Sequence, residues 1–301
     1  GMRWDSISQI AAALKNNGAL TGGLQVQRTF MTSQITDIMT YINAIHSNAR
    51  LANGKPTFDG YVVRNPASPA AINHCAQAVG GNDPRRLLKD LDVPMIGVVA
   101  QGEVVGMLAS RKPDNAKYHL WEVAASSHID KFAYSGLASW ADQTAAVGAA
   151  GTQGTPQWPF SARCEPEIVM QDMPLLRYIF NGAFDAMERW VKDGVAPATA
   201  PRIEITGNTM KLDSYGIASG GIRSPYSDLP TAVYTTSSNG GGSCRELGTT
   251  TPLSWVKLEQ LYGNQKAYAQ KAGPAINKLV KDRFVTEADA QRMRVELGVV
   301  K

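Results

Sequence analysis

The feature that most constrains the fold is a strand-like run that leads directly into an amphipathic helix, in residues 25–44. The run QVQRTFMTSQ is β-prone as far as Ser33 and Gln34, and ITDIMTYINA then carries apolar residues at helical spacing. The sequence therefore predicts a strand followed at once by a helix, with a serine hydroxyl at the corner between them.

Strand-like and helix-like segments alternate along the first half of the chain. Short apolar runs bounded by turn residues predict the strands, and apolar residues at a spacing of three or four predict the helices. Such alternation is typical of a parallel sheet in an α/β protein. The expected strands cover residues 58–63, 93–100 and 118–125, and the expected helices cover residues 4–14, 84–91 and 104–109.

The sequence pattern changes after about residue 140. Residues 148–159 are rich in small residues and proline, which is typical of a boundary or surface loop. A helix is expected over residues 175–192, and the last fifty residues are again helical, with Thr286 as the cap of the final helix. We therefore expect a sheet-bearing core in residues 1–140 and a helix-rich extension in residues 141–301.

Composition narrows the range of partners. With 44% hydrophobic and 19% charged residues, a chain of 301 residues has the composition of a globular protein with a sizeable core. The net charge of +4 is mild and the basic residues are scattered, so neither nucleic acid nor a membrane surface is expected as a partner. No apolar stretch approaches the roughly 18 residues of a membrane span.

The three cysteines and the glycine pairs indicate no metal or cofactor. Cys75, Cys164 and Cys244 lack the paired spacing of metal ligands, and Gly220-Gly221 is part of neither a phosphate loop nor a dinucleotide fingerprint. Two readings of the cysteines stay open: three buried thiols, or a bridge between Cys164 and Cys244. A bridge would indicate an oxidising compartment, secreted or periplasmic, and the compartment is otherwise undetermined.

Six sequence segments, in order over most of the chain, carry a resemblance to a known family. Together they make the chain similar to a poorly characterised α/β-hydrolase domain family. The segments are SQITDIMTYINAIH (33–46), FDGYVV (58–63), DVPMIGVVAQGE (92–103), WEVAASSHID (121–130), RWVKDGVAP (189–197) and GIASGGIRSP (216–225).

This resemblance implies a serine hydrolase with Ser33 as nucleophile, His128 as base and Glu103 as the acid. The chain order serine, acid, histidine is the order found in α/β-hydrolases. The N–H of Gln34 would supply half of the oxyanion hole, and Arg223 could bind a substrate carboxylate. The implied reaction is esterase-like hydrolysis of a small carboxylic ester or amide, without a metal or other cofactor.

Two departures from the family pattern keep another reading open. Met31 and Ile35 occupy positions that are usually small around such a serine, and only some thirty residues precede Ser33. We therefore expect a sheet without the N-terminal strands of the fold, whose open edge would favour a homo-oligomer or a separate N-terminal half as partner. The alternative is a catalytically inactive remnant that acts as a binding or interaction module.

Overall fold

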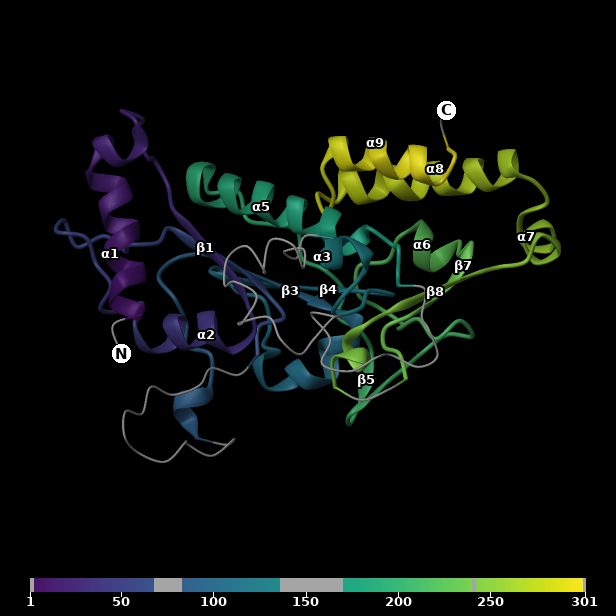
Figure 1. Ribbon diagram of the computed structural model, residues 1–301, viewed down its shortest axis with the longest axis horizontal. Helices are drawn as coiled ribbons and strands as arrows, with labels where there is room; N and C mark the ends of the chain where they lie inside the picture. Colours follow the sequence, from purple (N-terminus) through teal and green to yellow (C-terminus); the bar gives the residue numbers. More distant parts are fainter. Residues whose placement is uncertain (1–2, 68–82, 136–169, 240–241, 300–301) are drawn as a thin grey trace, which may run out of the picture. The chain divides into compact units, whose positions relative to one another are not determined.

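The computed structural model describes residues 3–67, 83–135, 170–239 and 242–299. Its main sheet has four parallel strands, and the pairing of β1 with β2 and of β2 with β3 is in parallel register. The strands follow one another in chain order, so the expected α/β class is confirmed (Figure 1). The strands are β1 (Phe30–Gln34), β2 (Gly60–Arg64), β3 (Met95–Ala100) and β4 (Tyr118–Val123).

The chain divides into two compact units. The first unit holds residues 1–99, 106–121 and 182–200, and the second holds the remaining residues, 100–105, 122–181 and 201–301. The boundary expected near residue 140 falls outside the described residues.

In the first unit, helices cover both faces of the sheet. Met187, in α5 (Leu175–Asp193), lies directly over Gly60, because a Cβ added to Gly60 would come 2.5 Å from the Met187 sulfur. The neighbouring Tyr61 hydroxyl lies 2.7 Å from Nδ1 of His46, just beyond α2 (Ile35–Ala44). Since consecutive strand residues point to opposite faces, α5 and α2 lie on opposite sides of β2 (Figure 1).

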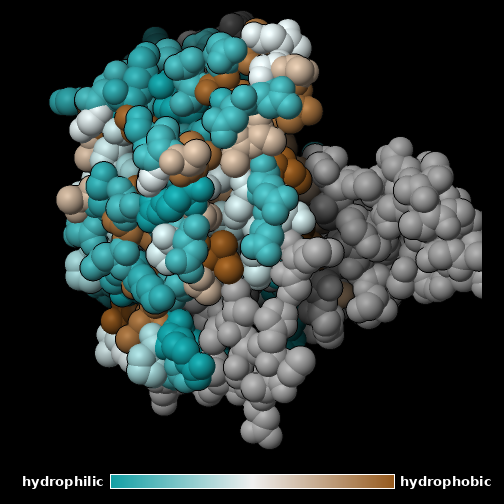
Figure 2. Space-filling view, turned by 90° about the vertical axis from the view of Figure 1, so that its left-hand side faces the viewer, coloured by the Kyte–Doolittle hydropathy of each residue, from teal (hydrophilic) through white to brown (hydrophobic). Residues whose placement is uncertain are grey.

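An N-terminal helix packs against α2 in the same unit. This helix, α1 (Arg3–Asn16), brings Ser8 Oγ to 2.7 Å from the Tyr41 hydroxyl and the Trp4 ring to 5.9 Å from the Tyr41 ring. The 3-10 helix η1 (Gly18–Thr21) follows it. Figure 2 views the molecule from the side on which α1 lies in Figure 1. The coloured surface there is mainly polar, with apolar side chains in small separate groups. Such scattering is ordinary for a protein surface.

One predicted helix of the first unit is wrong. Instead of a helix over residues 84–91, the structure has the short 3-10 helix η2 (Pro84–Arg86), after which Leu87 is extended. Asn43 explains the difference, because its side-chain amide donates to the carbonyls of Arg85 and Leu87 and accepts the N–H of Lys89 at 3.1 Å. These backbone groups would otherwise be available to continue the helix. The helical link expected over residues 104–109 is the 3-10 helix η3 (Gln101–Ser110).

The second unit is rich in helices, as expected for the C-terminal half. Thr286 caps the final helix, its hydroxyl accepting the N–H of Asp289 at 3.1 Å, which confirms that prediction. The last two helices lie side by side in Figure 1. Over the described residues, no helix is both long and apolar enough to cross a bilayer. Among the described residues, its helices are the start of α5 (residues 175–181), α3 (Lys131–Ser135), α6 (Pro225–Asp228), α7 (Trp255–Tyr262), α8 (Gln265–Lys281) and α9 (Glu287–Glu296).

Among its described residues, this unit also contains four short strands and one further 3-10 helix. They form two antiparallel pairs, one of which closes around the turn at residues 207–208. The pairs are β5 (Ile205–Thr206) with β6 (Thr209–Met210), and β7 (Ala232–Thr235) with β8 (Thr249–Pro252); the 3-10 helix is η5 (Gly242–Glu246).

A single carboxylate fastens α9 to two other helices of the second unit. Glu296 accepts the hydroxyl of Tyr178 in α5 and the hydroxyl of Tyr226 in α6, each at 2.6 Å. Both phenol rings are buried. Burial, reinforced by the bond to Glu296, raises the pKa of Tyr178 to about 12 and also raises that of Tyr226. The folded state therefore holds both phenols in their neutral form.

We expect the free energy of unfolding to fall as the pH rises from about 10 to about 12. An unfolded tyrosine has a pKa near 10, so between these values the unfolded chain gives up protons that folded Tyr178 and Tyr226 retain. The stabilisation is complete below pH 10 and is lost as the pH rises through the folded pKa, at about 1.4 kcal/mol per pH unit for each tyrosine. Urea titrations between pH 8 and pH 12 measure this slope.

The matched variant is Tyr226→Phe, which removes one of the two titrating hydroxyls. Its slope above pH 10 should be shallower than that of the wild type by about the contribution of one tyrosine. An identical slope in the two proteins would show that Tyr226 does not carry the alkaline instability.

Candidate active site

The second unit brings an acidic residue and a histidine together at two neighbouring strand ends. Glu103 lies in η3, directly after β3, and His128 lies five residues beyond the end of β4. Their side chains meet, with His128 Nδ1 3.1 Å from Oε1 of Glu103. The imidazole side chain is 10% exposed and the carboxylate 22%, so the pair lies at the edge of solvent. A proton on Nδ1 can be donated to this carboxylate, which would orient the ring.

The buried side chain of Gln101 connects the segments that carry these two residues. Its Oε1 accepts the N–H of Ala125 at 2.8 Å, and the backbone N–H of Gln101 donates to Ser126 Oγ at 3.2 Å. Ser126 in turn donates its hydroxyl to the carbonyl of Val123 at 2.7 Å. Ala125 has a φ of 64°, in the left-handed region, which reverses the chain direction after β4. The turn before His128 is thus held to the end of β3.

A second buried glutamine supports the histidine loop from the other side. Gln171 accepts the N–H of Ser127 at 3.2 Å and donates to the carbonyls of Ala125 and Thr235, each at 2.9 Å. Both glutamines are almost completely buried, and buried amides of this kind need all their partners. The backbone on the N-terminal side of His128 is therefore fixed by side chains from two directions.

Another carboxylate lies on the opposite side of the imidazole. Oε2 of Glu246, the last residue of η5, is 4.0 Å from His128 Nε2. Its position follows from backbone pairing, since Ile129 donates its N–H to the Glu246 carbonyl at 2.9 Å and forms a parallel bridge with Leu247. Half of the Glu246 side chain is exposed. The ring of His128 therefore has one carboxylate facing each nitrogen.

Ser33 and Gln34 end the strand β1 in the first unit. The strand runs to Gln34 and α2 begins at Ile35, so the predicted passage from strand to helix with Ser33 at the corner is confirmed. Ser33 is exposed and is in register with Val63 of β2. Met31, two residues before the serine, lies within the strand. A nucleophile in an α/β-hydrolase stands at a corner of this kind.

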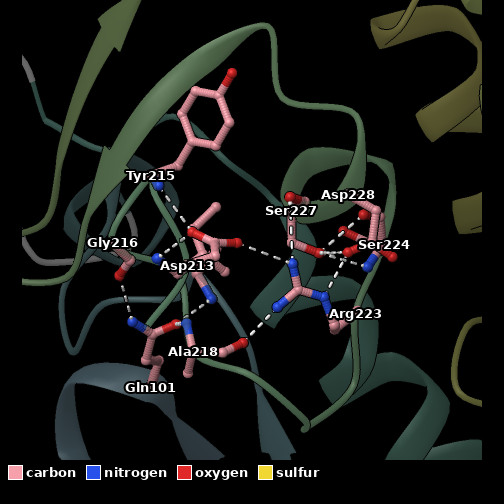
Figure 3. Close-up of polar contacts among 11 residues, drawn as sticks. Gln101, Asp213, Tyr215, Gly216, Ala218, Arg223, Ser224, Ser227 and Asp228 are labelled. Atoms are coloured by element: carbon pink, nitrogen blue, oxygen red, sulfur yellow. Dashed lines mark hydrogen bonds and ion pairs between the residues drawn. The ribbon is translucent and has the colours of Figure 1, made fainter. Parts of the chain in front are cut away.

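Arg223 is the centre of a polar network in the second unit (Figure 3). Its guanidinium donates to Asp228 and to the carbonyl of Ala218, and Nη2 lies 3.3 Å from Oδ2 of Asp213. Gln101 meets the same loop, accepting the N–H of Ala218 at 2.9 Å. Arg223 also lines a cavity of about 300 Å³. To bind a substrate carboxylate, as predicted from sequence, the guanidinium would have to exchange one of these partners.

Close backbone contacts explain the glycine pair that precedes Arg223. A Cβ at Gly220 would lie 2.2 Å from the carbonyl oxygen of Arg202, and one at Gly221 would lie 2.9 Å from the carbonyl oxygen of Glu122. Both glycines have positive φ. The glycines therefore allow three chain segments to pack closely together at the end of β4.

The structure describes one of the three cysteines, and its acidic, histidine and cysteine side chains can be compared with the needs of a metal site. Cys244 is disulfide-bonded, which contradicts the reading of three buried thiols. Cys75 and Cys164 both lie outside the described residues, so the pairing of Cys164 with Cys244 stays a prediction. Within the described ranges, no group of three or more His, Cys, Asp or Glu side chains is placed to hold a metal ion.

Three residues around His128 were not identified from sequence, namely Gln101, Gln171 and Glu246. Gln101 offered a weak signal, because it is a polar residue at the end of an apolar strand, two positions before Glu103. Glu246 offered none, since it follows a Gly- and Ser-rich stretch and its approach to His128 depends on the pairing of Ile129 with Leu247.

Comparison with known protein families gives a match over almost the whole chain. The family described as alpha/beta hydrolase domain matches residues 1–295. No curated protein and no solved structure matched the chain.

We expect Gly248→Ala to destabilise the protein, because this glycine packs directly on the histidine loop. The added Cβ would lie 2.5 Å from the Ser127 side chain and 2.7 Å from the carbonyl oxygen of Thr235. Such overpacking should lower the free energy of unfolding by about 1–3 kcal/mol, measured by urea denaturation. The matched control is Gly106→Ala, where nothing lies within 4 Å of the added Cβ and the change should stay within about 0.5 kcal/mol. Equal effects of the two changes would contradict the packing argument.

Proposed function

Because the chain belongs to the alpha/beta hydrolase domain family, we propose that it is a serine hydrolase acting on small carboxylic esters or amides. Family membership indicates hydrolase activity in general. The proposal adds the mechanism, in which Ser33 is the nucleophile, His128 the general base and Glu103 the acid that orients the histidine.

The observation that carries the proposal is the contact between His128 and Glu103. With Nδ1 3.1 Å from the carboxylate, Nε2 is the nitrogen that would exchange a proton with the substrate or the nucleophile. The carboxylate also stabilises the positive charge that the ring acquires when it takes that proton. A histidine and an acid at the ends of two neighbouring strands are the arrangement that this chemistry needs.

The proposed reaction has two steps. Ser33 Oγ attacks the substrate carbonyl carbon while Nε2 of His128 takes the hydroxyl proton, and the resulting tetrahedral intermediate expels the alcohol or amine, which receives that proton. Water then attacks the acyl-serine, gives its proton to Nε2 and releases the carboxylic acid, whereupon Ser33 recovers its hydrogen. Overall, one water molecule is consumed and the enzyme is unchanged.

Gln34 is proposed to stabilise the oxyanion through its backbone. It lies between Ser33 and the first residue of α2, so its N–H is located at the N-terminus of this helix. Backbone N–H groups at a helix N-terminus favour negative charge, and one oxyanion donor is typically worth about 3 kcal/mol. Because a backbone donor needs no particular side chain, a glutamine can occupy the position.

We expect a fluorophosphonate probe to label the protein at Ser33. The probe forms a covalent bond with a serine only when a neighbouring base activates it, so labelling reports the nucleophile without knowledge of the substrate. Ser33→Ala should abolish labelling, which gel fluorescence and peptide mass spectrometry measure. Ser47→Ala removes an exposed serine of the same unit and should label like the wild type.

Two outcomes would contradict the proposal. Labelling that survives Ser33→Ala would assign the nucleophile elsewhere, and no labelling of folded wild-type protein would favour a non-catalytic binding module. Circular dichroism of each sample establishes that the protein is folded.

Glu103→Gln should lower kcat for a labile ester by about 10⁴-fold, because the neutral amide no longer fixes the tautomer of His128 or stabilises its charged form. KM should change much less, since Glu103 is proposed to act through the histidine. Steady-state kinetics with a p-nitrophenyl ester measure both constants. A variant with nearly full kcat would remove Glu103 from the mechanism.

A further inference from the structure

The ring of His128 lies between two carboxylates, and the proposed mechanism uses only one of them. Glu103 faces Nδ1 at 3.1 Å, whereas Glu246 faces Nε2 at 4.0 Å. Nε2 is the nitrogen that would give its proton to the departing alcohol or amine. A negative charge beside Nε2 is therefore a charge beside the leaving group.

The position of Glu246 is set by its backbone and not by its exposed side chain. Its carbonyl accepts the N–H of Ile129 at 2.9 Å, and two residues later Gly248 donates its N–H to the Ile129 carbonyl at 3.2 Å. Cys244, two residues earlier, is buried and disulfide-bonded. The segment that carries Glu246 is thus attached to the segment that carries His128 at the glutamate and just after it, while the disulfide of Cys244 fixes the residue two positions before it.

The carboxylate of Glu246 is free to act on an incoming molecule. It is 51% exposed, and over the described residues His128 is its only ion-pair partner. At 4.0 Å it is beyond hydrogen-bond length from Nε2, so it acts on that nitrogen through its charge. A purely structural ion pair would instead be expected to make a close, direct contact.

We propose that Glu246 selects substrates by charge and favours esters or amides whose leaving group is positively charged. This inference rests on the proposed function, because it takes Nε2 as the atom that faces the leaving group. An ammonium group on the alcohol or amine is attracted to Glu246, while a carboxylate at the same place is repelled by it and by Glu103. The residue forms no bond to the substrate and alters no atom balance of the reaction.

The segments that carry His128 and Glu246 also hold one further carboxylate and two cations. Asp130, on the histidine segment, is buried and adds a third carboxylate, whose Oδ1 accepts the Ala133 N–H at 2.7 Å. The cations on the same segments, Lys131 and Arg245, are both exposed. Over the described residues, the two carboxylates that face the imidazole nitrogens are those of Glu103 and Glu246.

The experiment compares three phenyl acetates that carry a trimethylammonium, a neutral or a carboxylate substituent on the phenol. The wild type should show a higher kcat/KM for the cationic ester than for the anionic one. The charge of Glu246 at about 7 Å from the substituent attracts the cationic ester and repels the anionic one, by about threefold in each case, so Glu246→Gln should lower the ratio of the two kcat/KM values by about tenfold. The neutral ester should change by less than about twofold, and 0.5 M NaCl should weaken the preference because Glu246 is half exposed.

Matched variants separate charge from structure. Glu246→Asp keeps the charge and should keep most of the preference, while Glu259→Gln removes an exposed carboxylate from α7 and should leave the ratio unchanged. A wild type without any charge preference, or a ratio unaffected by Glu246→Gln, would overturn the inference.

A binding measurement distinguishes failure of this inference from failure of the proposed function. Phenyltrimethylammonium should bind the wild type about threefold more tightly than Glu246→Gln in calorimetric titration, with or without turnover. If no ester is hydrolysed yet this difference is found, the charge selection stands and the serine hydrolase proposal fails. Equal affinity of the two proteins would overturn the charge selection even in an active enzyme.

Discussion

The arrangement around His128 depends on one buried amide, the side chain of Gln101. Its oxygen accepts two backbone N–H groups, from Ala125 and Ala218, and its nitrogen donates to the carbonyl of Gly216. An alternative side chain would leave these buried backbone groups without partners, at about 1–3 kcal/mol each. The end of β3, the turn after β4 and the loop before Arg223 therefore all meet at the side chain of Gln101, and the contact between Glu103 and His128 forms near it.

Local patterns predicted the parts of this structure whose cause is local. The passage from β1 to α2 at Ser33, the buried run of β3 and the cap at Thr286 all follow from side chains within a few residues of one another. Where distant groups compete, the prediction failed or was silent. The amide of Asn43 takes the backbone bonds of the expected helix at residues 84–91, and Glu246 reaches His128 only through pairing of segments over one hundred residues apart.

The net charge of the chain likewise does not predict the charge next to His128. The chain as a whole carries a net charge of +4, yet the imidazole of His128 has a carboxylate facing each nitrogen. A screening length near 10 Å at ordinary ionic strength means that distant surface lysines and arginines contribute little at the ring. The chemistry available to His128 is consequently governed by Glu103 and Glu246, and composition alone would have indicated the opposite sign.

The left-handed backbone at Ala125 has a consequence for how this protein can diverge over evolutionary time. An alanine with a φ of 64° carries a steric penalty of about 1 kcal/mol, which glycine would relieve and any branched residue would increase. The site is fully enclosed, so asparagine or aspartate, which tolerate this backbone, would have to bury an extra polar head. Mutational drift at this position is thus confined almost to two amino acids, and a descendant bearing a larger one would have to rebuild the turn that leads into His128.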